Sequence, residues 1–411
     1  MRILYHLQLS AVDRKTKKFL MDKDSNFNFF ISMVKAMNEE AAMLKEEYKW
    51  CCLVPEESDM EYDELEFIDN VAYSKVKYCK DVFNSRYFWD VEEMKQEILI
   101  RKPDIIWENN PTLVNNWKTL LLEMGLIDKI KVANYNHWID SNQYPKIDRR
   151  CAYQYRQVEA IMLSDLTLCN SDFAKEQLER SACYLLSESA NDKCFDCIQP
   201  IPPMVDEVAI KEQQCEKNKK AIQIIYPHRL SSMNYYKDAF NKFIGILNHL
   251  KKVIKKDVVV VLTDASGKIK SRKEIPFEDN KYIKLVLKKN LNREKYYKEL
   301  NKSHICVATF KEGNGGNWSM GLAEAIVAEC AVVSVRHSGY KEMIPMQYTA
   351  ADDNMIGPML IRLIKDAVEL KRNSWLCNEF YQKRYGHRVV AKKLDELLIK
   401  LEEDDGRKTR I

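Results

Sequence analysis

Residues 307–344, VATFKEGNGGNWSMGLAEAIVAECAVVSVRHSGYKEMI, decide the fold of this chain. The apolar run Ser303–Thr309 predicts a buried strand, and the glycine- and asparagine-rich residues 311–317 predict a loop at its carboxyl end. Asn317 is the predicted N-cap of the helix that follows, and Ala331–Val335 predicts a second strand. Because strand, loop, helix and strand form a βαβ unit, we expect the loop at the sheet edge where α/β proteins bind ligands.

The chemistry of this loop suits a ligand that contains phosphate and hydroxyl groups. Glycine lets the backbone approach a ligand closely, and a helix N-terminus offers unpaired N–H groups and positive potential to a phosphate. Glu324, one turn into the helix, supplies an acceptor for hydroxyl groups. A tight turn followed by a solvated glutamate would give the same sequence, so the loop alone leaves both interpretations open.

Length and composition indicate a folded protein with two domains. The chain has 411 residues, of which 46% are hydrophobic and 31% charged. Its net charge of +4 is too balanced to indicate a nucleic-acid partner by itself. The sequence contains no recognisable signal peptide and no apolar run long enough to span a membrane, so we expect a cytoplasmic location and no membrane span.

The cysteines indicate thiols rather than a metal site. Twelve are scattered along the chain, several inside apolar runs, which is typical of buried reduced thiols. Cys194-x-x-Cys197, with Cys183 and Cys215 nearby, comes nearest to a zinc pattern but lacks a second CxxC pair. We therefore expect no metal.

Strands and helices alternate along both halves of the chain, which predicts parallel, doubly wound sheets. A break at Pro200-Ile201-Pro202-Pro203, followed by the charged stretch Lys211–Lys220, predicts a linker between the halves. The expected strands are residues 2–7, 51–54, 104–107, 131–135, 166–169, 222–226, 258–262, 282–287, 303–309 and 331–335. The expected helices begin after the cap Ser25 and cover residues 91–101, 111–124, 147–163, 172–180, 238–251, 293–300, 318–328, 354–370 and 389–403.

Two cations follow the first strand of the second half. Arg229 comes at the carboxyl end of strand 222–226, and Lys237 comes at the start of the next helix. Together with the N-terminus of helix 318–328 they would suit a diphosphate leaving group without a metal. Taken singly, each is equally explained as an ordinary surface cation.

At this point the sequence resembles the donor site of the GT-B glycosyltransferases, in particular the large retaining group (glycosyltransferase family 4-like) that includes sucrose synthases and bacterial mannosyltransferases. That group has a "GL..LEA" helix start followed by "CG.PVV.S..GG..E". The matching segments here are Gly321-Leu322-Ala323-Glu324-Ala325, Ala331-Val332-Val333-Ser334, Ser338-Gly339 with Glu342, Asn170-Ser171-Asp172-Phe173 and Pro202-Pro203-Met204-Val205-Asp206. The resemblance covers roughly residue 130 to the end of the chain.

The resemblance implies an α/β fold of GT-B type, with two Rossmann-like doubly wound domains facing a central cleft. Residues 1–205 would form the acceptor-side domain, residues 206–220 the linker and residues 221–375 the nucleotide-sugar-binding domain. Helices within residues 376–411 would cross back to the first domain.

The resemblance also implies roles for individual residues. Glu324 would bind the ribose hydroxyls of the donor, and Arg229 with Lys237 would neutralise the departing diphosphate. His137 would contact the donor sugar, although a hydrogen-bonded histidine at a strand end explains it equally well. The remaining donor-binding candidates are Glu312, Gly315, Gly316, Asn317 and the backbone N–H groups of Met320, Gly321 and Leu322.

The chain departs from the family pattern at three points. The family's Glu-x7-Glu motif would put its first glutamate at Gly316, and Glu312 comes four residues earlier. Arg229 and Lys237 are eight residues apart, whereas the family spacing is five. The glycine-rich loop expected after the first strand is absent between Leu7 and Asp24, which puts the acceptor side in question.

A second resemblance concerns residues 137–145, HWIDSNQYP, which are similar to the H-E-N-Q-x-x-Y-P segment of the queuosine-tRNA mannosyltransferases. It implies acceptor-side roles for Asp140 and Tyr144, with a carboxylate facing the acceptor hydroxyl. A modified tRNA base or a hydroxylated DNA base, as in DNA modification, then becomes a candidate acceptor. Lysine-rich segments Lys251–Lys256 and Lys281–Lys302 could hold phosphates, or could be solvated faces.

The sequence thus predicts a retaining hexosyl- or pentosyltransferase that uses a UDP- or GDP-sugar as co-substrate, with no tightly bound cofactor and no essential metal. Its acceptor would be DNA or tRNA, or alternatively a glycan or small molecule. Two other functions stay open: a non-catalytic nucleotide-sugar-binding protein, and a sugar-phosphate epimerase on the same fold, for which no acid–base pair can be placed.

Overall fold

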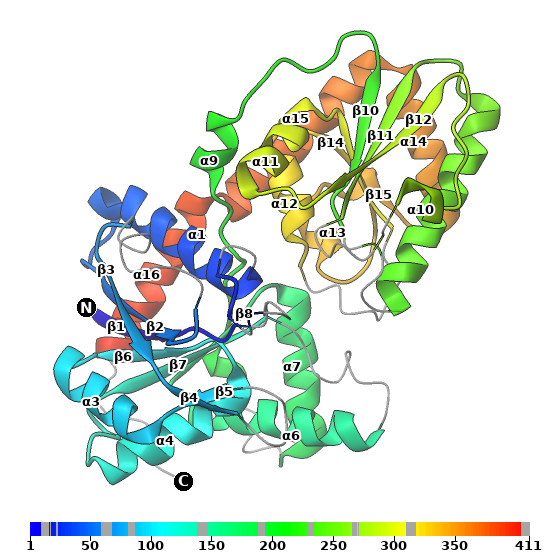
Figure 1. Ribbon diagram of the computed structural model, residues 1–411. Helices are drawn as coiled ribbons and strands as arrows, with labels where there is room; N and C mark the ends of the chain where they lie inside the picture. Colours follow the sequence, from blue (N-terminus) through cyan, green and yellow to red (C-terminus); the bar gives the residue numbers. More distant parts are fainter. Residues whose placement is uncertain are drawn as a thin grey trace. The chain divides into compact units, whose positions relative to one another are not determined.

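The computed structural model in Figure 1 divides into two compact units, Met1–Met204 with Val390–Ile411 (unit 1) and Val205–Val389 (unit 2). The structure describes residues 1–9, 16, 18–21, 24–58, 68–80, 87–137, 147–187, 194–228, 230, 234–264, 269, 271–309 and 318–403.

Unit 1 contains a seven-stranded sheet with the order β3-β2-β1-β6-β7-β8-β9, in which all neighbouring strands are parallel. The strands are β1 (Arg2–His6), β2 (Lys49–Pro55), β3 (Val71–Val76), β6 (Ile105–Glu108), β7 (Lys131–Asn136), β8 (Leu166–Cys169) and β9 (Ile198–Pro200). A separate antiparallel pair joins β4 (Tyr78–Lys80) to β5 (Tyr87–Trp89). The helices are α1 (Ser25–Glu39), α3 (Val91–Arg101), α4 (Val114–Glu123), α6 (Ile147–Leu163), α7 (Asp172–Leu185) and α16 (His387–Glu403), with short 3-10 turns at Ala41–Met43 and Pro111–Leu113.

The two faces of this sheet carry different helices. Successive strand residues point to opposite faces, so Tyr5 packs with α1 and α16, whereas Leu4 packs with α3 and α4. Leu394 and Leu398 of α16 are fully buried in the same cluster as Tyr5. Helix α16 is therefore part of the core of unit 1, although it follows unit 2 in the sequence.

Unit 2 contains a six-stranded parallel sheet with the order β12-β11-β10-β13-β14-β15. The strands are β10 (Ile222–Tyr226), β11 (Val258–Asp264), β12 (Ile283–Lys289), β13 (Ile305–Ala308), β14 (Ala331–Val335) and β15 (Thr349–Ala350). The helices are α9 (Glu207–Glu212), α10 (Asn234–Val253), α11 (Arg293–Lys302), α12 (Met320–Val327), α13 (Tyr340–Met343), α14 (Ile356–Lys365) and α15 (Ala367–Tyr385), with 3-10 turns at Arg272–Glu274, Met346–Tyr348 and Asp353–Met355. Helix α9 lies inside residues 206–220, which the sequence predicted as a linker.

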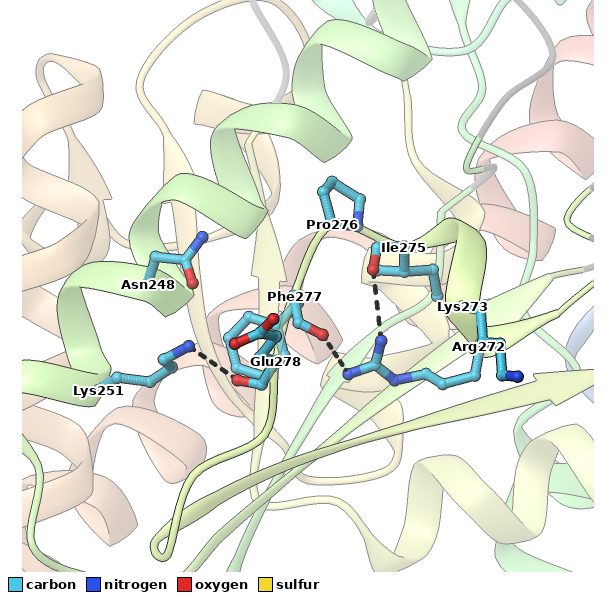
Figure 2. Close-up of a pocket in the computed structure, with 8 residues that line it drawn as sticks. All are labelled: Asn248, Lys251, Arg272, Lys273, Ile275, Pro276, Phe277 and Glu278. Carbon is cyan, nitrogen blue, oxygen red and sulfur yellow. Dashed lines mark hydrogen bonds between the residues drawn. The ribbon is translucent and has the colours of Figure 1, made fainter.

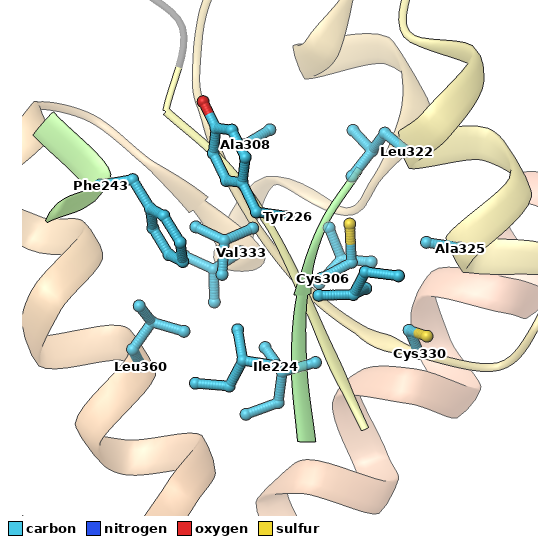
Figure 3. Close-up of a cluster of buried hydrophobic side chains, with 14 of the residues drawn as sticks. Ile224, Tyr226, Phe243, Cys306, Ala308, Leu322, Ala325, Cys330, Val333 and Leu360 are labelled. Atoms are coloured by element: carbon cyan, nitrogen blue, oxygen red, sulfur yellow. The ribbon is translucent and has the colours of Figure 1, made fainter. Parts of the chain in front are cut away.

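The core of unit 2 holds α12 against the sheet. Figure 3 shows Phe243 of α10 and Leu360 of α14 on one side of the strands and Leu322 and Ala325 of α12 on the other. All four side chains are at most a few per cent exposed. Burying a leucine or phenylalanine side chain contributes about 1.5–3 kcal/mol, so apolar burial holds α12 against its face of the sheet.

Two predicted helix caps are wrong. Asp24, not Ser25, caps α1, because its carboxylate accepts hydrogen bonds from the backbone N–H groups of Asn26 (2.8 Å) and Phe27 (3.4 Å). Ser319 caps α12, since its Oγ accepts from the N–H of Leu322 at 3.2 Å. Asn317, which the sequence predicted in that role, lies outside the described residues.

The expected helix 354–370 is in fact two helices. Asp366 interrupts it by capping α15, with its carboxylate accepting from the N–H groups of Val368 (2.9 Å) and Glu369 (3.0 Å). Helix α15 then continues to Tyr385, well beyond residue 370, where the sequence predicted the helix to end. The buried positions of α15 include Glu369 and Asn373, so its inner face lacks the apolar periodicity on which the prediction depended.

Among the described residues, no helix combines the length and the apolar character that crossing a membrane would require. This is in line with the expectation of no membrane span over that part of the chain.

The buried carboxylate of Glu207 connects the start of unit 2 to its end. Glu207 in α9 accepts hydrogen bonds from the backbone N–H of His387 (3.0 Å) and from Nε2 of Gln382 (3.1 Å), and its Oε1 lies 2.9 Å from Nδ1 of His387. Burial alone would raise the pKa of Glu207, but the hydrogen bonds and charge of His387 outweigh burial and lower the pKa to about 2.

We expect Glu207→Gln to lower the free energy of unfolding by up to about 3 kcal/mol at pH 7. Because the folded carboxyl is more acidic than the unfolded one, its contribution is complete above pH 4.5 and is lost as the pH falls toward 2. Urea unfolding of wild type and variant at pH 7 and at about pH 3 measures this difference. Glu212→Gln, an exposed change on the same helix, is the control. An equal difference between wild type and Glu207→Gln at both pH values would contradict the assignment.

Candidate functional site

The carboxyl edge of the unit 2 sheet has the geometry of a ligand site. Strand β10 pairs with β11 on one side and with β13 on the other, so the chain reverses its direction of winding between β10 and β13. In open parallel sheets, ligands bind in the crevice at this switch point. At this switch point the chain leaves β10 through residues 227–228, and after β13 it enters α12 through residues 318–322.

Helix α12 approaches the end of β10 very closely. A Cβ atom added to Gly321 would lie 2.9 Å from the carbonyl oxygen of Pro227 and 3.2 Å from its ring carbons. Only glycine permits this approach without a shift of the backbone. The first turn of α12, with Met320, Gly321 and Leu322, therefore lies directly against the switch point.

Glu324 is buried one turn further along α12 and is held by a cation that the sequence analysis missed. Its side chain is 4% exposed, and its Oε1 accepts a hydrogen bond from Nη1 of Arg293 at 2.6 Å. Burial, and after it the nearby carboxylate of Glu324, raises the pKa of Tyr296 well above its usual value. Burial by itself would lower the pKa of Arg293, but the carboxylate of Glu324 outweighs it and raises the pKa.

The sequence holds one signal that bears on Arg293, which is its place at the end of a strand. It is the first residue of α11 and follows β12, so it belongs to the same carboxyl edge as the loop after β13. Its guanidinium also lies 5.6 Å from the ring centroid of Tyr297. With 40% of its side chain exposed, Arg293 connects the buried carboxylate to the surface.

His228 fixes the end of β10. Its ring is buried, its Nε2 lies 3.2 Å from the carbonyl oxygen of Val307, and it packs edge-on against Tyr226. Burial lowers the pKa of His228 to about 3, against the opposing effect of the Val307 carbonyl. The ring is therefore neutral near pH 7, which leaves Nε2–H to donate to the Val307 carbonyl and to tie β10 to β13.

The corresponding edge of unit 1 carries His137, which follows β7. Its Nε2 lies 2.8 Å from Oδ1 of the fully buried Asn109, and its ring contacts Tyr135 and Phe29. Burial lowers the pKa of His137 to about 3, so the ring is neutral near pH 7. The structure agrees with a hydrogen-bonded histidine at a strand end and equally with a neutral group for a sugar hydroxyl.

A buried polar pair lies next to Asn109. Glu108 ends β6 and His6 ends the neighbouring β1, where the winding of the unit 1 sheet reverses. Glu108 pairs with His6 and accepts hydrogen bonds from Nε1 of Trp117 (2.7 Å) and from the N–H of Asn110 (2.6 Å). These bonds make Glu108 the centre of the hydrogen bonding at this edge.

The structure describes only some of the predicted site residues. Met320, Gly321, Leu322 and Glu324 come together in α12 of unit 2, and Lys237 is exposed in the first turn of α10. His137 belongs to unit 1. The predicted residues outside the described part of the chain are Arg229, Glu312, Gly315, Gly316, Asn317, Asp140 and Tyr144.

The described residues include no cluster of three or more His, Cys, Asp or Glu side chains that could hold a metal. Cys194 is buried, Cys197 and Cys215 are half-buried, and Cys183 is exposed.

No protein-family model matches the sequence, and no curated protein matches it either. Solved structures do. The Anabaena protein HepE, in complex with UDP and glucose, has a TM-score of 0.65 at 12% identity, over 97% of this chain and 100% of that one. Sucrose-phosphate synthase from Thermosynechococcus elongatus has a TM-score of 0.68 at 11% identity, over 98% and 99%. UDP-GlcNAc 2-epimerase from Methanocaldococcus jannaschii has a TM-score of 0.54 at 11% identity, over 97% and 100%.

At these identities the comparisons establish the fold and nothing finer. The chain has the GT-B fold, with two Rossmann-like domains built on parallel sheets. The fold class predicted from the sequence is confirmed. Because a sugar-nucleotide epimerase shares the fold, the fold by itself does not select the reaction.

We expect Gly321→Ala to destabilise the protein by about 1–3 kcal/mol, because the new methyl group must displace Pro227 or α12. Gly245→Ala, in α10, is the matched control. A Cβ at Gly245 has no atom within 4 Å, so this variant should be more stable than wild type by about 0.5–1 kcal/mol. Thermal unfolding of wild type and the two variants tests whether Gly321→Ala is less stable, and Gly245→Ala more stable, than wild type. A Gly321→Ala variant as stable as Gly245→Ala would show that α12 does not need the close approach.

A double-mutant cycle on Arg293 and Glu324 should give a coupling free energy on the order of 1–3 kcal/mol. Arg293→Ala leaves a buried carboxylate without its cation, whereas the double variant Arg293→Ala/Glu324→Ala removes the uncompensated charge. Chemical unfolding of wild type, both single variants and the double variant measures the coupling. Additive effects would mean that the pair contributes no stability.

Proposed function

We propose that this protein is a nucleotide-sugar-dependent glycosyltransferase that moves a hexosyl or pentosyl group from a UDP- or GDP-sugar to an acceptor hydroxyl. The observation that carries the proposal is the close contact of Gly321 with Pro227, which puts the N-terminus of α12 and the buried Glu324 at the switch point of the sheet. Structures with the same fold include HepE in complex with UDP and glucose, which supports a UDP-sugar as the donor.

Each group has a role in the proposed donor complex. The carboxylate of Glu324 accepts hydrogen bonds from the ribose hydroxyls, while the ion pair with Arg293 holds that carboxylate in its buried position. The N–H groups at the start of α12 face the phosphates, where a helix N-terminus stabilises negative charge. Neutral His137 exchanges a hydrogen bond with a hydroxyl of the donor sugar.

Catalysis in this proposal is electrostatic. As the bond between the sugar and the diphosphate breaks, negative charge grows on the leaving phosphate. Arg229 and Lys237, the latter in the first turn of α10, neutralise that charge together with the helix N-terminus. The neutral rings of His137 and His228 are not titrated near pH 7, so neither acts there as a cation. Retention of the anomeric configuration follows from the family resemblance.

The acceptor stays a prediction from the sequence. Asp140 and Tyr144, the acceptor-side candidates, belong to the segment that resembles the queuosine-tRNA mannosyltransferases and lie outside the described residues. A base of DNA or tRNA and a glycan or small molecule are both compatible with the proposed donor site.

The test is a thermal-shift screen with UDP, GDP, ADP and their sugars. We expect one nucleotide to stabilise the wild type, and Glu324→Ala and Arg229→Ala to weaken its binding tenfold or more, because each removes a charged hydrogen-bond partner worth about 1.5–3 kcal/mol. Glu294→Ala, an exposed carboxylate beside Arg293, should leave nucleotide binding unchanged.

Slow release of the nucleoside diphosphate from the donor then separates a transferase from a protein that only binds nucleotide sugars. The absence of any nucleotide-dependent shift in the wild type would exclude the proposed donor site. Isomerised donor sugar, in place of released diphosphate, would indicate an epimerase.

A further inference from the structure

The two units carry opposite net charges, which the nearly neutral total conceals. Unit 2 contains 33 Lys and Arg against 21 Asp and Glu, a net charge of +12. Unit 1 contains 32 against 40, a net charge of −8. A strong asymmetry of charge between the halves of a chain is typical of proteins that bind polyanions.

Part of the positive charge of unit 2 lies on one continuous surface. The end of α10 is separated in sequence from residues 272–284 by β11. Nevertheless, Nζ of Lys251 donates to the carbonyl of Glu278 at 2.7 Å, and Nδ2 of Asn280 donates to the carbonyl of Lys251 at 3.4 Å. Residues 251–257 and 272–284 together contain eight basic and four acidic side chains. We call the surface formed by these six residues the basic face: Lys251, Lys255, Arg272, Lys273, Lys281 and Lys284.

Two aromatic rings lie beneath four of the cations of the basic face. Lys251 and Arg272 lie over Phe277, with 4.8 and 5.7 Å to the ring centroid. Lys255 and Lys281 lie over Tyr282, at 5.5 and 5.4 Å. Because the charged groups already lie over the rings, they lose less conformational freedom when a phosphate binds.

Arg272 fixes the shape of this surface. It donates to the carbonyl oxygens of Leu285 (3.2 Å) and Phe277 (2.7 Å) and pairs with Asp279 at 2.9 Å, so one of the four carboxylates is already neutralised. Figure 2 shows the side chains of Lys251 and Arg272 on either side of Phe277. These three residues line a hollow of about 660 Å³. Lys273 at its rim is exposed.

We propose that the basic face binds the phosphate backbone of a nucleic acid. Lysine and arginine neutralise backbone phosphates without reading the base sequence. Binding to an anionic membrane is strengthened by large apolar side chains that insert beside the cations. Here Phe277 is buried, and the flanking Val253 and Val286 are only 36% and 37% exposed, which favours a nucleic acid.

The basic face lies away from the carboxyl edge that carries Glu324, because the end of α10 and residues 278–284 lie at the amino-terminal ends of β11 and β12. The proposal does not rest on the proposed sugar transfer. Binding to the backbone of a nucleic acid needs no sugar donor, so either proposal can fail while the other holds.

The experiment measures fluorescence anisotropy of a short fluorescein-labelled DNA duplex titrated with the full chain at KCl concentrations from about 50 to 300 mM. The test variant combines Lys273→Gln, Lys281→Gln and Lys284→Gln, which are exposed side chains. We expect its affinity to fall about tenfold or more, and the slope of log K against log salt to fall by about 0.9 for each phosphate that the variant no longer neutralises.

The control combines Lys129→Gln, Lys392→Gln and Lys400→Gln, exposed lysines of unit 1, and brings the net charge of +4 to +1 as the test variant does. The proposal is supported if the control binds the duplex within about twofold of wild type. It is overturned if both variants weaken equally, since net charge alone would then explain binding. It is also overturned if the wild type binds vesicles of phosphatidylcholine and phosphatidylglycerol but not the duplex. The nucleotide-induced thermal shift of the test variant should equal that of wild type, which separates this surface from the donor site.

Discussion

The contact between α12 and the end of β10 is the constraint on which the rest of unit 2 depends. Leu322 and Ala325 are buried against the strands, and Gly321 meets Pro227 at a distance that no side chain would allow. Apolar burial stabilises α12 against the sheet, and the absence of a side chain at Gly321 permits the close contact with Pro227. Once the helix is there, Glu324 is forced below the surface, so it needs the cation of Arg293. A packing requirement thereby creates a charged pair at a sheet edge.

Much of the fold could be predicted from the sequence because its signals are local. Strands such as Ile222–Tyr226 and Ala331–Val335 are continuous apolar runs, and the structure gives them the same bounds. The caps were less predictable, because Asp24 and Ser25, or Asn317 and Ser319, are all good capping residues. The choice between such neighbours is made by the angle at which the chain enters the helix, which depends on tertiary packing.

Helix α15 shows why other parts could not be predicted. Asn373 lies on its buried face, where its Oδ1 accepts from the N–H of Val332 at 2.7 Å and its Nδ2 donates to the carbonyl of the same residue at 3.0 Å. The side-chain amide of Asn373 thus makes the pair of hydrogen bonds with Val332 that a neighbouring strand would make. A polar residue therefore occupies a core position. Arg293 was missed for a related reason: a cation becomes part of a site only through a partner, Glu324, that is 31 residues away. By contrast, Gly321 and Glu324 were singled out from the motif that contains them, and both lie at the sheet edge where a βαβ unit puts them.

The return of α16 to unit 1 has a consequence for the order in which the protein acquires its structure. Unit 2 is inserted between two parts of unit 1, and its ends are joined by the contact of Glu207 with His387. Tyr48 of unit 1 donates to Asp395 of α16 at 2.8 Å, and Leu394 and Leu398 complete the core beside Tyr5. On the ribosome, unit 2 can therefore fold as soon as its own residues have emerged, while one face of the first sheet, partly covered by α1, is completed only when α16 is synthesised.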